Sequence, residues 1–466
     1  MKIEIRNFGP INTFSYDLSK DFIVTYGDNN IGKSYSMQIV YLLIKNLIEF
    51  TTMGTRYIGS YYSSGFGMLH ENSYEKCDKI INNFLEEEEE SKDITDVISK
   101  LFFESIGESI LSPFMNSCNN TFGNFERTLE KQPVIQVDFE DYNLSIDLKK
   151  ATIIGKIDIK PIYLKKADTD YFKSKSYKNY EAVYVSKNNT EKPIGALVDI
   201  NRKMLNNFAI YVNKNFDSVY FLPASRSGIY SGMNAFGSII AELSKNRAYL
   251  TRKIELPGIS EPISDYFINL SSIKQKVSEK YSVYYNQIED KILKGKVSFD
   301  KNKNALVYTP KDIEMQFEMT EVSSMVSEIS PIVAFLKYIL AYPVRRSRLM
   351  MSKSILFIEE PEAHLHPNNQ IQLIEVFSEL AAAGVKLVIS SHSNYVFNKL
   401  NNLLLSKKLD YKVYQPIFLD MTKEGSFSRF MHIDELGVDD ENFVDVSERL
   451  YFEREEIIQQ LNMEDE

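Results

Sequence analysis

The stretch that decides the fold covers residues 27–34 and reads Gly27-Asp28-Asn29-Asn30-Ile31-Gly32-Lys33-Ser34. It matches G-x-x-x-x-G-K-[ST], a loop that connects a strand to a helix and surrounds phosphates with backbone N–H groups. An apolar strand pattern precedes it over 21–26, and helical apolar spacing follows over 35–50. All eight residues are therefore predicted to bind ATP. Within the loop, Lys33 would reach the β and γ phosphates and Ser34 would ligate Mg²⁺.

A second motif joins four apolar residues to two carboxylates and reads Ile355-Leu356-Phe357-Ile358-Glu359-Glu360. A buried parallel strand delivers its carboxyl end to the ligand crevice of an α/β sheet, so we expect these acids to meet the bound phosphates. Glu359 would hold Mg²⁺, directly or through water, and Glu360 would polarise the attacking water. The alternative interpretation is a strand end with two solvated acids.

A histidine, His392, follows the next apolar strand, which covers 386–390. From a neighbouring strand end, its imidazole can hydrogen-bond a γ-phosphate oxygen or the attacking water. Lys33, Glu360 and His392 are therefore the predicted catalytic side chains. The alternative is that His392 only caps the following helix.

Apolar periodicity predicts how strands and helices alternate along the rest of the chain. The predicted strands cover 2–7, 14–18, 21–26, 218–222, 355–359 and 386–390, with strands of a second sheet over 133–164 and a hairpin over 296–319. The predicted helices cover 35–50, 194–212, 325–340 and 369–382, with further helical segments over 51–124 and 238–294. This order predicts an α/β fold whose core ends as a doubly wound sheet.

Composition sets the broad class. The chain has 466 residues, 44% hydrophobic and 25% charged, which is ordinary for globular proteins, and its net charge of −10 argues against a generally basic nucleic-acid coat. Cys77 and Cys118 are too few for a disulfide scaffold or a cysteine-based zinc site. His364 and His366 are either packed loop residues or a chance metal pair. With no signal-peptide pattern and no long apolar run, we expect a soluble, cytoplasmic protein without a membrane anchor.

Taken together, the motifs resemble those of ABC-type ATPases of the SMC and recombination-repair group, and most closely their short OLD-like relatives in bacterial antiviral defence. The opening segment 5–11 resembles the group's first strand and His392 its switch histidine. The Walker A, Walker B and D-loop motifs of the group correspond to 27–34, 355–360 and 362–367. The resemblance implies an ABC-type P-loop ATPase split around a mixed helical and β insertion. Its amino-terminal half would be 1–50, its insertion 51–319, and its carboxyl-terminal half, with an acidic tail, 320–466.

Two positions depart from the group's pattern. The signature motif, approximately L-S-S/G-G-E/Q, corresponds to a segment in which Ser323 and Ser324 are kept and Met325 replaces the glycine. The resemblance implies that these serines contact ATP held by a second protomer, although methionine hinders close backbone approach. Glu359 stands where the group usually has Asp. The extra methylene moves the carboxylate by about 1.5 Å and predicts slow turnover.

The resemblance implies a slowly hydrolysing ATPase that forms a homodimer or a higher homo-oligomer around ATP and controls a separate effector, encoded nearby, in anti-phage defence. One alternative is an SMC-like DNA-repair ATPase, although a long coiled coil is missing. Another is an OLD-like nuclease, although the tail over 434–466 is too short for the metal-binding Toprim domain of those enzymes. A transporter ATPase would need a compact motif spacing and an intact signature.

DNA is a further candidate partner. Ten lysines lie within 145–187, and they form either a groove for DNA or one solvated face of a sheet. Arg226 follows the predicted strand over 218–222, so it would lie at the carboxyl edge of the sheet. There it would sense phosphate, contact DNA or serve only as a loop arginine.

Overall fold

The computed structural model covers residues 1–466 and describes most of them. The described ranges are 1–58, 67–139, 141–167, 174–186, 194–232, 259–271, 273–274, 276–342, 353–434, 436–438 and 451–458, with side chains described outside 52–58 and 67–73. None of the helices in these ranges combines the length and apolarity needed to cross a membrane.

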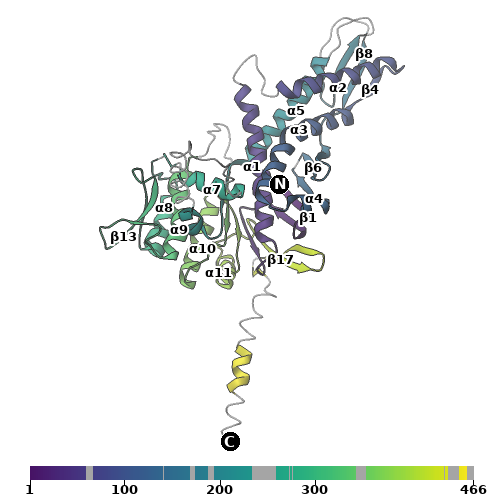
Figure 1. The fold of residues 1–466 in the computed structure, drawn as a ribbon. Helices are drawn as coiled ribbons and strands as arrows, with labels where there is room; N and C mark the ends of the chain where they lie inside the picture. The colour runs from purple at the N-terminus through teal and green to yellow at the C-terminus, as the bar shows by residue number, and fades with distance from the viewer. Residues whose placement is uncertain are drawn as a thin grey trace, which may run out of the picture.

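One mixed sheet of eleven strands runs through the molecule (Figure 1), in the order β11-β15-β16-β3-β17-β18-β2-β1-β5-β6-β7. Its strands are β1 (Lys2–Phe8), β2 (Ile11–Asp17), β3 (Phe22–Tyr26), β5 (Val134–Asp138), β6 (Tyr142–Asp147), β7 (Thr152–Ile157), β11 (Phe216–Leu222), β15 (Lys353–Glu359), β16 (Lys386–Ser390), β17 (Tyr414–Thr422) and β18 (Gly425–Phe430). The strands from β11 to β17 in this order run parallel, and most of the remaining neighbours are antiparallel.

Helices cover both faces of the parallel part. The helices of the whole structure include α1 (Lys33–Ile58), α2 (Gly67–Glu86), α3 (Thr95–Thr121), α4 (Phe125–Glu130), α5 (Ile194–Asn215), α7 (Glu261–Ser271), α8 (Ser282–Gln287), α9 (Ser324–Ala334), α10 (Pro367–Ala382) and α11 (Asn394–Leu405), with π-helical turns η2 (Ile288–Leu293) and η3 (Phe335–Ile339). Every residue of β3 and β16 is buried, and the middle of each strand is apolar, as is typical of central parallel strands.

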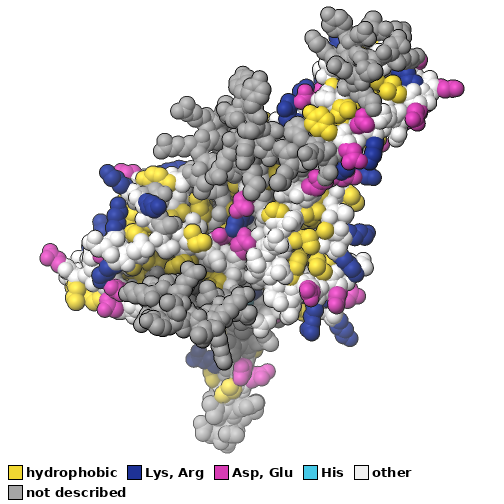
Figure 2. All heavy atoms as spheres, turned by 45° about the horizontal axis from the view of Figure 1, so that its top comes forward, with side chains coloured by type: hydrophobic (Ala, Val, Ile, Leu, Met, Phe, Trp, Pro, Cys, Tyr) yellow, Lys and Arg dark blue, Asp and Glu magenta, His cyan; other side chains and the backbone are white. Residues whose placement is uncertain are grey.

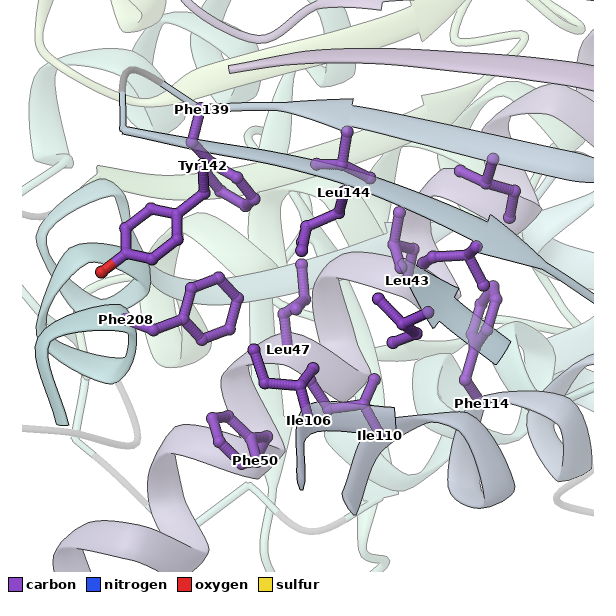
Figure 3. Packing of buried hydrophobic residues seen from close by; sticks show 14 of the residues in the cluster. Leu43, Leu47, Phe50, Ile106, Ile110, Phe114, Phe139, Tyr142, Leu144 and Phe208 are labelled. Atoms are coloured by element: carbon purple, nitrogen blue, oxygen red, sulfur yellow. The ribbon is translucent and has the colours of Figure 1, made fainter. Parts of the chain in front are cut away.

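The two faces of the sheet carry two hydrophobic clusters. In β15, Ile355 and Phe357 belong to one cluster, whereas Leu356 and Ile358 belong to the other, as the period of two requires. In the first cluster, side chains of α1, α3, α5 and β6 pack together (Figure 3). The second cluster is built from α7 to α11, η2 and η3. The parallel strands are thus held between two helical layers that fix the position of their ends.

Three smaller sheets lie outside this core. The first contains β4 (Ser91–Asp93), β8 (Ile162–Ala167), β10 (Glu181–Ser186) and β9 (Ser174–Ser176) and lies at the far end of an arm with α2, α3 and α5 (Figure 1). The second contains β12 (Gly295–Asp300), β13 (Ala305–Pro310) and β14 (Phe317–Glu318). The third pairs β19 (Ile433–Asp434) with β20 (Gly437–Val438).

The predicted α/β fold is confirmed, and so are the opening order of three strands, a loop and a helix, and the later order of α9, β15, α10 and β16. The hairpin over 296–319 is confirmed as β12 and β13, joined by β14. Strands from 1–50, 51–319 and 320–466 all contribute to the main sheet. Residues 238–258 of the predicted helical segment over 238–294 lie outside the described residues. Most of the tail over 434–466 does too, and 451–458 is helical.

The predicted second sheet over 133–164 was wrong. β5, β6 and β7 extend the main sheet, because β5 pairs with the edge of β1. Their register places Ile135 opposite Ile5 and Val137 opposite Ile3, so the buried residues of both strands lie on the same face. Only β8 belongs to a separate sheet. Alternation in the sequence predicts the strands, but it does not specify which edge they join.

Candidate nucleotide-binding site

The loop over 27–34 connects β3 to α1, as predicted. Gly27 has φ +140° and Gly32 has φ +95°, conformations that side chains disfavour. A Cβ on Gly27 would lie 2.4 Å from the carbonyl oxygen of Leu419 in β17. The hydroxyl of Ser426 in β18 donates a hydrogen bond to the carbonyl of Ile31. The hairpin of β17 and β18 therefore supports the loop, a role that the sequence interpretation missed.

Lys33, His392 and Glu360 form a row at the carboxyl edge of the sheet. The Lys33 Nζ lies 3.3 Å from His392 Nδ1, and His392 Nε2 lies 3.5 Å from Glu360 Oε1. A neutral imidazole with its proton on Nε2 satisfies both contacts, accepting from the ammonium and donating to the carboxylate. Lys33 also donates to the carbonyls of Gly27 (2.8 Å) and Asp28 (2.6 Å), so its ammonium is held over the loop.

The protonation states in this row follow from its contacts. The hydrogen bond with His392 lowers the pKa of the Glu360 carboxyl, with help from the positive charges of Lys33 and Arg226. Burial lowers the pKa of the Lys33 ammonium to about 8, against the opposing effect of Glu360 and Asp28. Near neutral pH the site therefore presents a carboxylate and an ammonium on either side of the histidine.

Glu359 lies beside the loop and is buried (4% exposed). Its Oε2 accepts a hydrogen bond from the backbone N–H of Ala224 (3.1 Å), and the side chain of Ser34 lies close enough to the carboxylate to act on its pKa. The Oε1 atom has no hydrogen-bond partner among the described residues. Burial raises the pKa of this carboxyl. A hydroxyl beside a carboxylate oxygen that lacks a partner is an oxygen donor set that fits Mg²⁺.

Glu362 fixes the end of β16. Its Oε1 accepts hydrogen bonds from the backbone N–H of His392 (2.7 Å) and the hydroxyl of Ser391 (2.8 Å). Burial raises the pKa of the Glu362 carboxyl. The sequence interpretation placed Glu362 in the D-loop-like segment but did not predict that it would orient His392. His366 caps α10, accepting at Nδ1 from Asn368 N (3.3 Å).

Ser323 and Ser324 lie at the amino end of α9. Ser323 is the N-cap, and its hydroxyl accepts from Val326 N (3.4 Å). Both serines are exposed. Within the described part of the chain, neither side chain bonds to the loop or to the acidic strand end. The structure thus brings the predicted residues of the loop, β15 and β16 together and leaves the two serines on the surface.

Arg226 lies at the carboxyl edge of the sheet, as predicted, but contact with DNA or phosphate was wrong, because its side chain is 0% exposed. Instead of facing DNA or phosphate, the guanidinium donates to the carbonyls of Glu359 (2.7 Å) and Glu360 (3.2 Å). It also pairs with Glu328 of α9. Contact with DNA or phosphate was predicted because Arg226 follows a strand end and most arginines are exposed to solvent.

The described lysines within 145–187 are spread over two sheets, and Lys173 and Lys187 lie outside the described residues. Lys149, Lys150 and Lys156 lie on or beside the β6–β7 hairpin of the main sheet, whereas Lys165 and Lys166 lie on β8 of the arm. Figure 2 shows Lys and Arg side chains interspersed with Asp and Glu on the described part of one face. Binding of DNA by these lysines stays a hypothesis.

Comparison with known proteins identifies the class. The chain belongs to the AAA ATPase domain family, whose model matches residues 1–397. No curated protein sequence matches the chain.

Among solved structures, the SMC head bound to the C-winged helix domain of ScpA is 10% identical, with a TM-score of 0.36, over 93% of this chain and 98% of that chain. The SMC head domain of Thermotoga maritima is 8% identical, with the same TM-score and coverage. An SMC head with an extended coiled coil, bound to the C-terminal domain of ScpA from Pyrococcus furiosus, is 10% identical over 92% and 95%, with a TM-score of 0.35.

Proposed function

We propose that this protein is an ABC-type ATPase of the SMC and OLD-like group that binds ATP with Mg²⁺, hydrolyses it slowly and oligomerises around it. The observation that carries the proposal is the row formed by Lys33, His392 and Glu360 at the loop, with Glu359 beside Ser34. Lys33 and Ser34 lie more than 300 positions before the other three groups in the sequence. Their meeting at one sheet edge is what phosphoryl transfer needs, since its catalysis is mainly positioning and charge stabilisation.

Each group has a defined task in this proposal. Backbone N–H groups of the loop and the amino end of α1 bind the phosphates, and Lys33 adds a charge-assisted contact to the γ phosphate. Glu360 accepts a proton from the attacking water, while His392 bonds to the γ phosphate or to that water. Ser34 and Glu359 would hold Mg²⁺, which neutralises developing phosphate charge.

Slow turnover is expected from the geometry of Glu359. Because its Oε2 is engaged by Ala224 N, only one carboxylate oxygen is available towards Ser34. The side chain is also one methylene, about 1.5 Å, longer than the aspartate of the group. Glu359 would therefore hold Mg²⁺ less well than that aspartate does, and turnover would be slow.

The first test is phosphate release. We expect the purified protein to release phosphate from ATP in Mg²⁺ at a rate below about 1 s⁻¹, the low end for enzymes. Release should stop when EDTA removes the metal and should return when Mg²⁺ is restored. The reason is that Ser34 and Glu359 would hold Mg²⁺ through their side-chain oxygens. A coupled phosphate assay measures both states. Equal rates with and without metal would contradict the metal assignment.

We further propose that a homodimer or a higher homo-oligomer forms around ATP, with Ser323 and Ser324 completing the site of the neighbouring protomer. Their exposed position at the amino end of α9 supports this, because the amino terminus of a helix suits an anionic phosphate. The output would then be mechanical, since binding and release of ATP change the assembly.

The final element of the proposal is a separate effector, encoded nearby, that the ATPase controls in anti-phage defence. We expect no cleavage of DNA or RNA by the protein alone in Mg²⁺ or Mn²⁺. Co-expressed with the neighbouring gene product, it should co-purify as a complex whose composition changes with ATP. Robust cleavage retained in Glu360→Gln would contradict this proposal and restore the nuclease alternative.

A further inference from the structure

Arg226 lies at the centre of a buried hydrogen-bond cluster that the proposed hydrolysis does not use directly. From the start of the helical segment over 226–232, its Nε donates to the carbonyl of Glu328 in α9 (3.0 Å). Its Nη1 and Nη2 donate to the carbonyls of Glu359 (2.7 Å) and Glu360 (3.2 Å). One rigid, planar guanidinium therefore connects α9 to the end of β15.

The Glu328 carboxylate completes the connection. It accepts hydrogen bonds from the backbone N–H of Arg226 (3.0 Å), from Ser227 N (3.1 Å) and from Ser227 Oγ (2.7 Å). The side chains of Arg226 and Glu328 are 0% and 1% exposed. A buried ion pair is costly to desolvate, and well-packed apolar side chains often stabilise a fold as well or better. A gain in stability therefore does not by itself explain why this pair is buried. Its hydrogen bonds also fix the positions of the Glu359 and Glu360 carbonyls, which apolar side chains would not do.

The backbone of Glu360, which the cluster holds in place, is strained. Glu360 has φ +41°, a left-handed conformation that a non-glycine residue keeps only when its surroundings hold it. On one side, the Glu360 N–H donates to the carbonyl of Ser390 (3.1 Å). On the other side, its carbonyl accepts from Arg226. Held from both sides, the backbone directs the Glu360 carboxylate towards His392, 3.5 Å away.

We propose that Arg226 is a positioning residue for ATP hydrolysis and that, together with Glu328, it transmits movements of α9 to the backbone of Glu360. Glu328 lies about one turn after Ser324, the residue proposed to contact the nucleotide of a second protomer. Closure of the dimer would press on the amino end of α9, and the pair would carry that displacement to the catalytic carboxylate. This inference rests on the proposed function of the site.

A second buried ion pair on the same helical segment provides a matched control. In η3, the Lys337 Nζ donates to Glu289 Oε1 (2.6 Å) and to the carbonyl of Val297 (2.8 Å). The side chains of Lys337 and Glu289 are 8% and 2% exposed. This pair joins η3 to η2 and β12, and none of its hydrogen bonds reaches the end of β15.

The experiment compares Glu328→Gln with Glu289→Gln, because both replace a buried carboxylate by an amide of the same shape. We expect both variants to lose thermal stability and to bind ATP with Kd within about threefold of wild type. Only Glu328→Gln should lower kcat, by about tenfold to about 100-fold, since misplacing a catalytic group by about 1 Å costs up to about 100-fold. Arg226→Lys keeps the charge but cannot reach its acceptors together, so it should show the same split between kcat and Kd and replaces Glu328→Gln if that variant does not fold.

Amide hydrogen exchange over residues 359–365 gives a readout that needs no hydrolysis. It should become faster in Glu328→Gln and stay unchanged in Glu289→Gln, because only the first variant loosens the held backbone. A wild-type protein that does not hydrolyse ATP would contradict the proposed function, while the exchange would still test the positioning. Unchanged exchange in Glu328→Gln, or an equal fall of kcat in both variants, would overturn the inference.

Discussion

Replacing Lys33 by alanine is expected to weaken ATP binding by about 100-fold or more. The carbonyls of Gly27 and Asp28 hold the Lys33 ammonium over the loop that is proposed to surround the phosphates. A hydrogen bond to a charged group contributes about 1.5 to 3 kcal/mol, and each 1.4 kcal/mol is about tenfold in Kd. Isothermal titration calorimetry with ATP measures the difference directly.

Lys45→Ala is the control for this loss of charge. Lys45 lies on the same helix, α1, and bonds to Glu261 (2.7 Å) and Asp265 (2.6 Å), far from the loop. Its removal should lower thermal stability and leave the Kd for ATP unchanged. If Lys33→Ala bound ATP as tightly as wild type, the assignment of the loop would be wrong.

The pH dependence of binding follows from the same lysine. In the free protein, burial lowers the pKa of Lys33 to about 8, and bound phosphate would raise it, because negative charge favours the ammonium. Below pH 8 the ammonium is already present, so ATP affinity should not depend on Lys33 protonation. Above pH 8, binding must take up a proton, and the Kd should rise by about tenfold per pH unit. Titrations on both sides of this value check the sign.

The loop and the acidic strand could be predicted because their chemistry is local in sequence. A glycine-rich loop between a strand and a helix carries its phosphate-binding geometry in consecutive residues. The meeting of Glu360 with His392 could also be predicted, since parallel strands bring their carboxyl ends to one edge. β15 and β16 are adjacent in the sheet, with Glu359 paired to Ser390.

Other parts could not be predicted because they depend on contacts distant in sequence. Arg226 and Glu328 lie 102 positions apart, and nothing in either segment indicates that both side chains are buried. In the same way, Ser426 supports the loop from a hairpin 395 positions away. The strands over 134–157 could be predicted individually, but their pairing with β1 depends on which sheet edge is free. Sequence periodicity predicts which residues of a strand are buried, but it does not predict which strand lies next to it.

Glu360→Gln is expected to lower kcat by about 100-fold or more while ATP still binds. The substitution keeps the size of the side chain and its contact with His392, but an amide cannot accept the proton of the attacking water. Loss of a general base costs about 100-fold to about 10,000-fold. Single-turnover phosphate release measures the loss, and titration calorimetry measures binding. As a control, Glu379→Gln changes an exposed carboxylate of α10 and should leave both quantities unchanged.

Because Glu360→Gln would keep ATP bound, it should also accumulate the assembly that hydrolysis normally dissolves. Light scattering is expected to show at least a dimer with ATP and Mg²⁺ and a smaller species without nucleotide. Adding Ser324→Arg should weaken that assembly, because a bulky side chain at the exposed amino end of α9 would obstruct the nucleotide of the second protomer. If Ser324→Arg left the mass of the assembly unchanged, the contact with the second protomer would lie elsewhere than at α9.

If Glu360→Gln kept the kcat of wild type, Glu360 would have no part in the reaction, and His392 would then be the remaining candidate for orienting the water.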